Sequence, residues 1–492
     1  MRGQSLVLAV ACLILLGGTA TASAASNTAT RQFLTLARFP SAGRSDLVFS
    51  RNLRDDDSDE RVFNGVIERV ASAAKVGAEK VKEKALLALG KSADDAFDSY
   101  KVVFSEKLLD SPEFTKWSNY VTKLTKNDQA AMTKIADTLT RKIGEDALVS
   151  LIVAAKKPSG KPELAKNLEN GLLQAWANDK KSANAVFYAI DLNTAKDTLF
   201  GSPNLQIWAN YVTKLNNGNS DASWMAMVQT LGLHYDPLTL ARLINYATGT
   251  VSVGHLASGM QSAQFSIWRN AGATADDIFK FLELGGLGDK IFASNRFSIW
   301  EKYVGELHKQ RQSLYMASIL ASHYGDDGLV KLIEATKKAS SNVKLANKLQ
   351  EGLLQHWRMS KKTSDNVFTL LHLEKKGGFL IGSQETKLWS KFVLRQHNND
   401  EQASFAEMVN VMSKHYELDA LARYIQSAKV SPSVGKFASS LQSAQFAEWN
   451  KREDKSDIIK TLLTPKPLSS ANEISRNKEV VKAFNNYIPS NQ

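Results

Sequence analysis

The sequence predicts an all-α protein, built as an elongated superhelical array of tandem helical-bundle repeats. The first observation behind this prediction is a recurring tryptophan: Trp117, Trp208, Trp300 and Trp389 follow one another at intervals of about 91 residues. Each is followed three residues later by another aromatic side chain, and this spacing places both rings on one face of a helix. The second is a composition with only 10 Pro in 492 residues and abundant Ala, Leu, Lys and Glu, which favours helices. A fixed period indicates an array of stacked units rather than one large core.

The first segment, residues 1–24, is typical of a signal peptide. Arg2 supplies a positive charge, and the apolar core from Leu6 to Leu16 is too short to span a bilayer as a helix. Small residues at the end of the segment predict cleavage between Ala24 and Ala25, in preference to a retained membrane anchor. No later apolar run is long enough to span a membrane. Cleavage removes the only cysteine of the chain, which excludes catalysis by a thiol.

Residues 25–61 lack a periodic apolar face and are expected to form a disordered leader. This leader contains Arg51-Asn52-Leu53-Arg54, and the acidic stretch that follows ends in Asp59-Glu60-Arg61. A signal peptide, then Arg-x-Leu-Arg, then acidic residues resembles the leader of the RxLR effectors secreted by oomycete plant pathogens. The resemblance implies a role for both motifs in delivery into host cells. The alternative is a solvated linker of mixed charge, and the single glutamate departs from the two that are usual in the family.

A helix is predicted over residues 62–90, where apolar side chains such as Val62, Val66 and Val70 recur at steps of three or four. Gly90 and Ser92 mark its end and the start of the next helix.

Three aromatic motifs recur in a constant order from about residue 91 to the C-terminus. They resemble the W, Y and L motifs of the WY and LWY helical modules found in many RxLR effectors. The resemblance assigns the four tryptophans of the 91-residue period to the W motif. It assigns Tyr235, Tyr324 and Tyr416 to the Y motif, from which Ile143 of the first unit departs. The tryptophans of the L motif are Trp176, Trp268, Trp357 and Trp449. All eleven side chains are expected to be structural core residues.

These motifs divide the chain into units. We expect a WY unit over 91–158, LWY units over 159–250, 251–340 and 341–431, and a partial LW unit over 432–492. In the last unit Phe484 takes the place of the W-motif tryptophan, which is typical of a terminal cap. Alternate units are the more similar ones: Gly171 and Gly352, 181 residues apart, begin the same Gly-Leu-Leu-Gln-x-Trp pattern. Duplication of a two-unit block explains this pattern.

Candidate catalytic residues are few. Each Y-motif tyrosine follows a histidine (His234, His323, His415), and histidines can act in acid–base catalysis or hold a metal. They recur at equivalent positions of separate units, far from other histidines, so a structural role is the favoured interpretation. The sequence therefore predicts no enzyme, no metal site, no cofactor and no small-molecule substrate.

The formal net charge of +12 raises nucleic acid as an alternative partner. A basic helical-repeat protein that binds host nucleic acid is the alternative function, but no face for base contacts is recognisable. Lysine-rich, solvated helix faces explain the charge more simply, so nucleic acid is the less favoured partner.

What the resemblance implies is a secreted, non-enzymatic virulence effector. Such a protein enters plant host cells, in the cytoplasm, the nucleus or both, and is expected to act there as a monomer. It binds host plant proteins through its helical-repeat surface and suppresses immunity or cell death. Some effectors of this family recruit the core of host protein phosphatase 2A, which makes this core one candidate partner.

Overall fold

The computed structural model describes residue 77 and residues 79–338, 342–466 and 469–487. The predicted cleavage site at Ala24–Ala25, the Arg51-Asn52-Leu53-Arg54 motif and Asp59-Glu60-Arg61 lie outside the described residues. Of the helix predicted over 62–90, the described part is helical at residue 77 and over residues 79–88.

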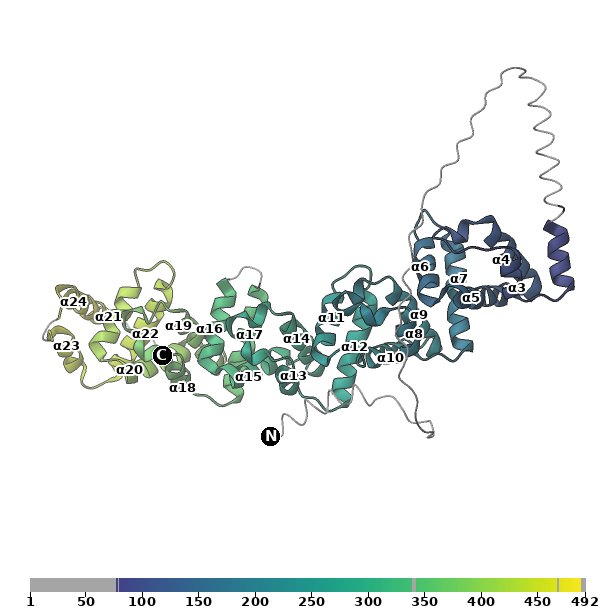
Figure 1. Cartoon of the computed structure of the whole chain (residues 1–492). Coiled ribbons are helices and arrows are strands. Elements are labelled where there is room, and N and C mark those ends of the chain that lie inside the picture. Colours follow the sequence, from purple (N-terminus) through teal and green to yellow (C-terminus); the bar gives the residue numbers. More distant parts are fainter. Residues whose placement is uncertain (1–76, 78, 339–341, 467–468, 488–492) are drawn as a thin grey trace, which may run out of the picture. The chain divides into compact units, whose positions relative to one another are not determined.

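The described residues form helices, with no β-strand among them, and the predicted all-α class is confirmed (Figure 1). They divide into two compact blocks, a first block up to Gly272 and a second block from Ala273 onward. Each block is described by itself below.

The first block contains ten α-helices after residues 79–88. They are α3 (Ala93–Ser99), α4 (Pro112–Thr125), α5 (Asp128–Ile143), α6 (Glu145–Ala155), α7 (Pro162–Asn178), α8 (Ala183–Ala189), α9 (Asn204–Leu215), α10 (Ser220–Leu231), α11 (Pro237–Ala247) and α12 (Gly254–Asn270).

The described part of the second block contains twelve α-helices. They are α13 (Ala275–Phe281), α14 (Asn295–Leu307), α15 (Gln312–Tyr324), α16 (Asp326–Lys338), α17 (Val343–Met359), α18 (Ser364–Leu370), α19 (Gln384–Gln396), α20 (Glu401–His415), α21 (Leu418–Ala428), α22 (Gly435–Lys451), α23 (Lys455–Leu463) and α24 (Ala471–Asn485).

Short 3₁₀ turns precede each W-motif helix. They are η1 (Leu108–Asp110), η2 (Leu192–Thr194), η3 (Lys196–Gly201), η4 (Leu284–Gly286), η5 (Gly288–Ala293), η6 (Leu373–Lys375) and η7 (Gly377–Phe379).

Capping side chains explain where many helices begin. The hydroxyl of Ser92 accepts the backbone N–H of Asp95 at the start of α3, and the Asp95 carboxylate accepts the N–H of Ser92 in return. Thr274 and Thr363 build the same reciprocal cap ahead of α13 and α18. Such a cap satisfies N–H groups that have no partner within the helix. Ser92 thus starts the helix that the sequence predicts there.

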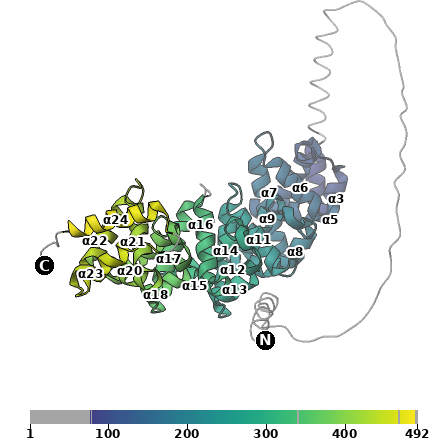
Figure 2. The ribbon, with the colours of Figure 1, turned by 90° about the vertical axis from the view of Figure 1, so that its left-hand side faces the viewer.

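The same packing scheme returns within each block. In the first block α5 packs against α4, α6 and α7, and in the second α15 packs against α14, α16 and α17. The group α5, α6 and α7 stays together in both views of the ribbon (Figures 1 and 2). In the first block one hydrophobic cluster continues from Leu86 to Ala263. At the C-terminal end, Trp449 and Phe484 meet edge to face in a smaller cluster.

Candidate functional site

The four W-motif tryptophans occupy the same environment in successive units. Each is fully buried, and each indole Nε1–H donates to the carbonyl of the first residue of the helix that precedes it. These bonds join Trp117 to Ala93, Trp208 to Ala183, Trp300 to Ala275 and Trp389 to Ser364, and all four measure 2.8 Å. A phenylalanine of the same preceding helix meets each indole edge to face, with ring centroids 5.0–5.3 Å apart. Each tryptophan therefore fixes one helix pair by packing and by a directed hydrogen bond.

The aromatic residue three positions later fixes the same helix pair at a second point. The hydroxyls of Tyr120, Tyr211 and Tyr303 donate to the carbonyls of Lys91, Lys181 and Ala273, at 2.5–2.7 Å. Each acceptor stands directly before the residue that caps the partner helix.

The fourth copy has Phe392, which has no hydroxyl to donate. Gln396, one helical turn later, makes the hydrogen bond instead. Its side-chain amide donates to the carbonyl of Lys362 at 2.8 Å and accepts from the hydroxyl of Ser364 at 2.7 Å. One hydrogen bond is thus made by different residues in different units.

In the Y motif the histidine stacks on the aromatic cluster, and in the fourth unit Tyr416 also meets Phe368, edge to face at 6.5 Å. His234, His323 and His415 stack on Phe187, Phe279 and Phe368, the rings that contact the W-motif tryptophans. Their Nε2 atoms lie 2.7 Å from the side-chain oxygens of Asn184, Asp276 and Asp365.

The Y-motif tyrosines lie at the edge of the core, where they are only partly buried. Their hydroxyls donate to loop carbonyls: Tyr235 to Lys196, Tyr324 to Leu284 and Tyr416 to Leu373. The physical reason is the phenolic hydroxyl, which needs an acceptor and finds one in the loop at the rim.

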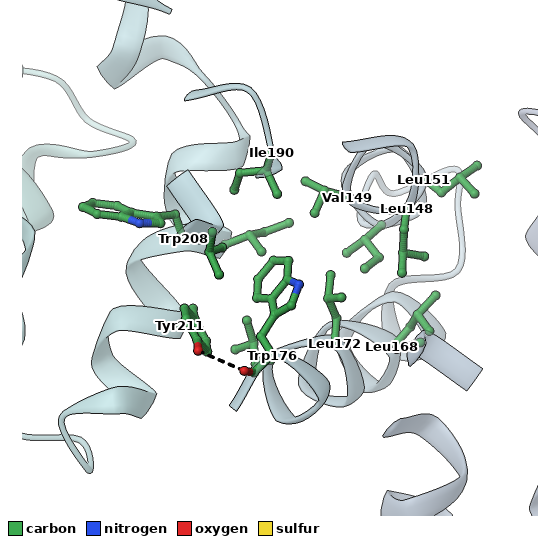
Figure 3. Close-up of a cluster of buried hydrophobic side chains, with 14 of the residues drawn as sticks. Leu148, Val149, Leu151, Leu168, Leu172, Trp176, Ile190, Trp208 and Tyr211 are labelled. Atoms are coloured by element: carbon green, nitrogen blue, oxygen red, sulfur yellow. Dashed lines mark hydrogen bonds between the residues drawn. The ribbon is translucent and has the colours of Figure 1, made fainter. Parts of the chain in front are cut away.

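The L-motif tryptophans are buried as well. Trp176 lies among Leu148, Val149, Leu172 and Tyr211, whose hydroxyl donates to its carbonyl (Figure 3).

L motifs of two kinds alternate along the chain. In the first kind the indole donates to a carboxylate at the start of the preceding helix: Trp176 to Glu145 at 3.0 Å and Trp357 to Asp326 at 2.7 Å. Lys181 and Lys362 pair with the same two carboxylates.

Glycine distinguishes this first kind further. A Cβ at Gly171 would overlap the backbone of Met132 in α5, and a Cβ at Gly352 would overlap that of Ser313 in α15. Two helices therefore touch through their backbones at these points. In the second kind of L motif, Ala263 of α12 occupies the position that corresponds to these glycines.

The sequence analysis missed a buried polar position that stands seven residues before each L-motif tryptophan. Its occupants are Glu169, Gln261, Gln350 and Gln442. Glu169 pairs with Lys156, and Gln261 donates to Asn245 at 2.9 Å. Gln350 accepts from Lys337 at 2.5 Å, and Gln442 accepts from Lys429 at 2.5 Å. The signal in the sequence is a polar residue at constant spacing on an otherwise apolar helix face.

Two open grooves flank the contact of α5 with α7. Groove A, about 780 Å³, is lined by residues 125–137 at the end of α4 and along α5, and by residues 174–179 at the end of α7. Groove B, about 890 Å³, lies between α5, α7 and α9, and Gln129 lines both grooves.

Two properties of the described chain concern other kinds of site. No group of three or more His, Cys, Asp or Glu side chains within it is arranged to hold a metal ion. None of its helices combines the length and the apolar character needed to cross a membrane.

Comparisons with known proteins find similarity to RxLR effector proteins of Phytophthora. No family model matches it. RxLR effector protein PSR2 of Phytophthora sojae is 27% identical over 356 residues, which are 72% of this chain and 53% of that protein. RxLR effector protein PSR2 of Phytophthora infestans is 24% identical and covers 73% of this chain and 47% of its own length. The chain thus spans about half the length of the curated relatives it matches.

The crystal structure of PcRxLR12 superimposes with a TM-score of 0.56 at 26% sequence identity, covering 82% of this chain and 98% of that one. The homologues carry the name that the leader and the repeats suggested, and the solved structure shares the helical fold. This chain is an all-α helical-repeat homologue of the RxLR effector proteins of oomycetes.

Proposed function

We propose that the chain is a secreted virulence effector that enters plant host cells and binds host proteins through the surface of its helical units, thereby suppressing immunity or cell death. It acts there as a monomeric, non-enzymatic scaffold, in the cytoplasm, the nucleus or both. The relatives named as RxLR effectors support this proposal. One candidate partner is the core of host protein phosphatase 2A, which such a scaffold would recruit.

The observation that carries the proposal is a repeated core beneath a diversified surface. Positions 181 residues apart keep the buried pair Trp176 and Trp357, with its carboxylate acceptor. A surface position of the same helices changes in character: the exposed Asn170 of α7 corresponds to the partly buried Glu351 of α17. A scaffold whose core repeats while its faces diverge can offer a different binding surface in each unit.

The proposal divides the chain by task. The leader, residues 25–61 with Arg51-Asn52-Leu53-Arg54 and Asp59-Glu60-Arg61, would serve delivery. The units over 91–158, 159–250, 251–340, 341–431 and 432–492 would carry the host-directed activity.

The test is to produce residues 62–492 directly in plant cytosol, without signal peptide or leader. The expected result is reduced cell death after an immune elicitor is applied, together with stable capture of a host protein by the purified chain. Purified phosphatase 2A core, mixed with the full mature chain, tests that partner separately by size-exclusion chromatography. An undiminished immune response would overturn the proposal.

A further inference from the structure

Two lining residues of groove B differ in character from the residues 181 positions later in the second block. They are Asn170 of α7 and Lys214 of α9, and no side-chain hydrogen bond joins them within the described chain. The residues 181 positions later are Glu351 and Arg395, which form an ion pair between α17 and α19. An ion pair therefore joins α17 and α19 at the positions where the first block has Asn170 and Lys214.

The lining of the two grooves is rich in side-chain amides. They are Asn127, Gln129, Asn167, Asn170, Gln174, Asn178 and Asn210. Charges are few and partly neutralised within groove A, where Asp137 pairs with Lys134 and with Arg141 just beyond it. A lining of this kind suits a ligand that presents hydrogen-bonding groups without a strong net charge.

The amides differ in how much of their hydrogen-bonding capacity the protein already uses. Asn210 is held in place, since its oxygen accepts from Gln206 at 2.9 Å and its nitrogen donates to Glu169 at 2.8 Å. Gln129, Asn167 and Asn170 are exposed, and within the described chain their side-chain amides form no hydrogen bond. Each offers a donor and an acceptor toward the same groove.

We propose that grooves A and B form one docking surface for an extended peptide segment of a host protein, bound mainly through its main chain. A side-chain amide matches the alternating N–H and C=O groups of an extended backbone, with a donor and an acceptor of its own. Gln129 lines both grooves, so a segment that occupies both would pass this side chain. The inference rests on the proposed function and assigns it a class of partner.

The test exploits the natural difference between the blocks. Asn170→Glu gives groove B the carboxylate that Glu351 supplies in the second block, where Lys214 can pair with it as Arg395 does. The full mature chain and this variant are compared in selection from a displayed library of short unstructured peptides of plant proteins. The inference predicts enriched peptides whose affinity falls at least about tenfold in Asn170→Glu, with an unchanged melting temperature.

Two further measurements make the result specific. Methylation of successive backbone nitrogens in an enriched peptide should weaken binding, because it removes main-chain donors. Glu351→Asn, the matched change in the second block, should leave the affinity unchanged.

The inference is overturned if no peptide is enriched above the Asn170→Glu background. It is also overturned if the enriched peptides bind equally well after backbone methylation, or if they bind as folded helices. If the Asn170→Glu variant still suppresses immune responses, the proposed function stands and only the role of grooves A and B in it is wrong.

Discussion

A buried indole N–H without an acceptor costs free energy, and the W-motif tryptophans show how one residue meets that requirement. Each donates to the carbonyl of the first residue of a helix. This carbonyl lies 24 or 25 residues earlier in the chain, so one side chain joins two helices across the intervening turns. Ring burial supplies most of the stabilisation, and the hydrogen bond supplies direction.

Truncation of this side chain should be costly. Trp208→Ala should lower the free energy of unfolding by about 3–5 kcal/mol, because it removes a fully buried ring and leaves a cavity. Trp208→Phe should cost less, since a ring remains and only the bond to Ala183 is lost. Urea unfolding followed by circular dichroism measures both variants. Unchanged stability in Trp208→Ala would show that the ring is not a core element.

One Y-motif histidine, His234, links the stability of the first block to pH. Burial lowers the pKa of His234, and its Nε2 faces the neutral amide of Asn184. His323 faces a carboxylate: burial acts to raise the pKa of Asp276, but hydrogen bonds from Lys280 and His323 outweigh this effect and lower it. A proton is therefore poorly accommodated at His234, whereas His323 has an anionic partner.

The direction of the change of stability with pH follows from how strongly the unfolded and the folded chain bind a proton at His234. Unfolded chains bind the proton near pH 6.5 and the folded chain binds it only at lower pH, so stability falls as the pH drops through about 6.5. Asn184→Asp gives this histidine the partner found in the other two units, and it should reduce the loss of melting temperature between neutral and mildly acidic pH. Identical pH profiles for the wild-type chain and Asn184→Asp would contradict the assignment.

Residue spacing revealed the rings but not all of their partners. The tryptophan series and the aromatic residues three positions later could be predicted because their spacing matches the period of a helix. Their acceptors are backbone carbonyls of other helices, which any residue provides, so the sequence contains no sign of them. Gln396 shows the limit most clearly: it replaces the hydroxyl that Phe392 lacks, and only the fold brings it to the Lys362 carbonyl.

At the scale of elements, the two kinds of L-motif helix differ in how closely they approach their neighbours. Gly171 lets α7 touch the backbone of α5, and Gly352 does the same for α17 on α15. The duplication of a two-unit block, read from the 181-residue spacing, thus has a physical counterpart in a repeated backbone contact. The sequence showed the shared glycine, but the helix it meets became known only from the structure.

Gly171→Ala tests this contact. Alanine favours a helix over glycine by up to about 1 kcal/mol, so propensity alone predicts a gain in stability. A new Cβ would overlap the Met132 backbone, which can yield only if α5 and α7 separate, and such overpacking costs about 1–3 kcal/mol. The expected net result is a lower melting temperature.

Gly328→Ala in α16 is the matched control, because its new Cβ would lie 3.5 Å from the nearest atom, Tyr324 Cβ, an ordinary contact. This control should be neutral or stabilising. A loss of stability as large as that of Gly171→Ala would show that the backbone contact is not the cause.

At the scale of the whole molecule, the proposed function separates delivery from activity. The described residues are committed to packed helical units with a repeated core, whereas the Arg51-Asn52-Leu53-Arg54 motif precedes them. The leader over residues 25–61 is predicted from the order of its motifs alone, and it stays a prediction because these residues lie outside the described part of the chain. The proposed binding surface could not be predicted from the sequence. The first block has Asn170 where the second block has an ion pair of Glu351 with Arg395, and this difference is seen only when the two folded blocks are compared.

Replacing Arg51, Leu53 and Arg54 with Ala should therefore impair virulence only when the pathogen must deliver the protein. The melting temperature should stay unchanged, because these residues precede the buried core, whose earliest described side chain is Leu86. The same variant, produced inside plant cells, should suppress immune responses as strongly as the wild-type chain, since delivery is then bypassed. Infection assays with a complemented pathogen strain and direct expression in leaves measure the two settings in parallel. Equal loss in both settings would place these residues in the activity itself, and the separation of tasks between leader and helical units would be wrong.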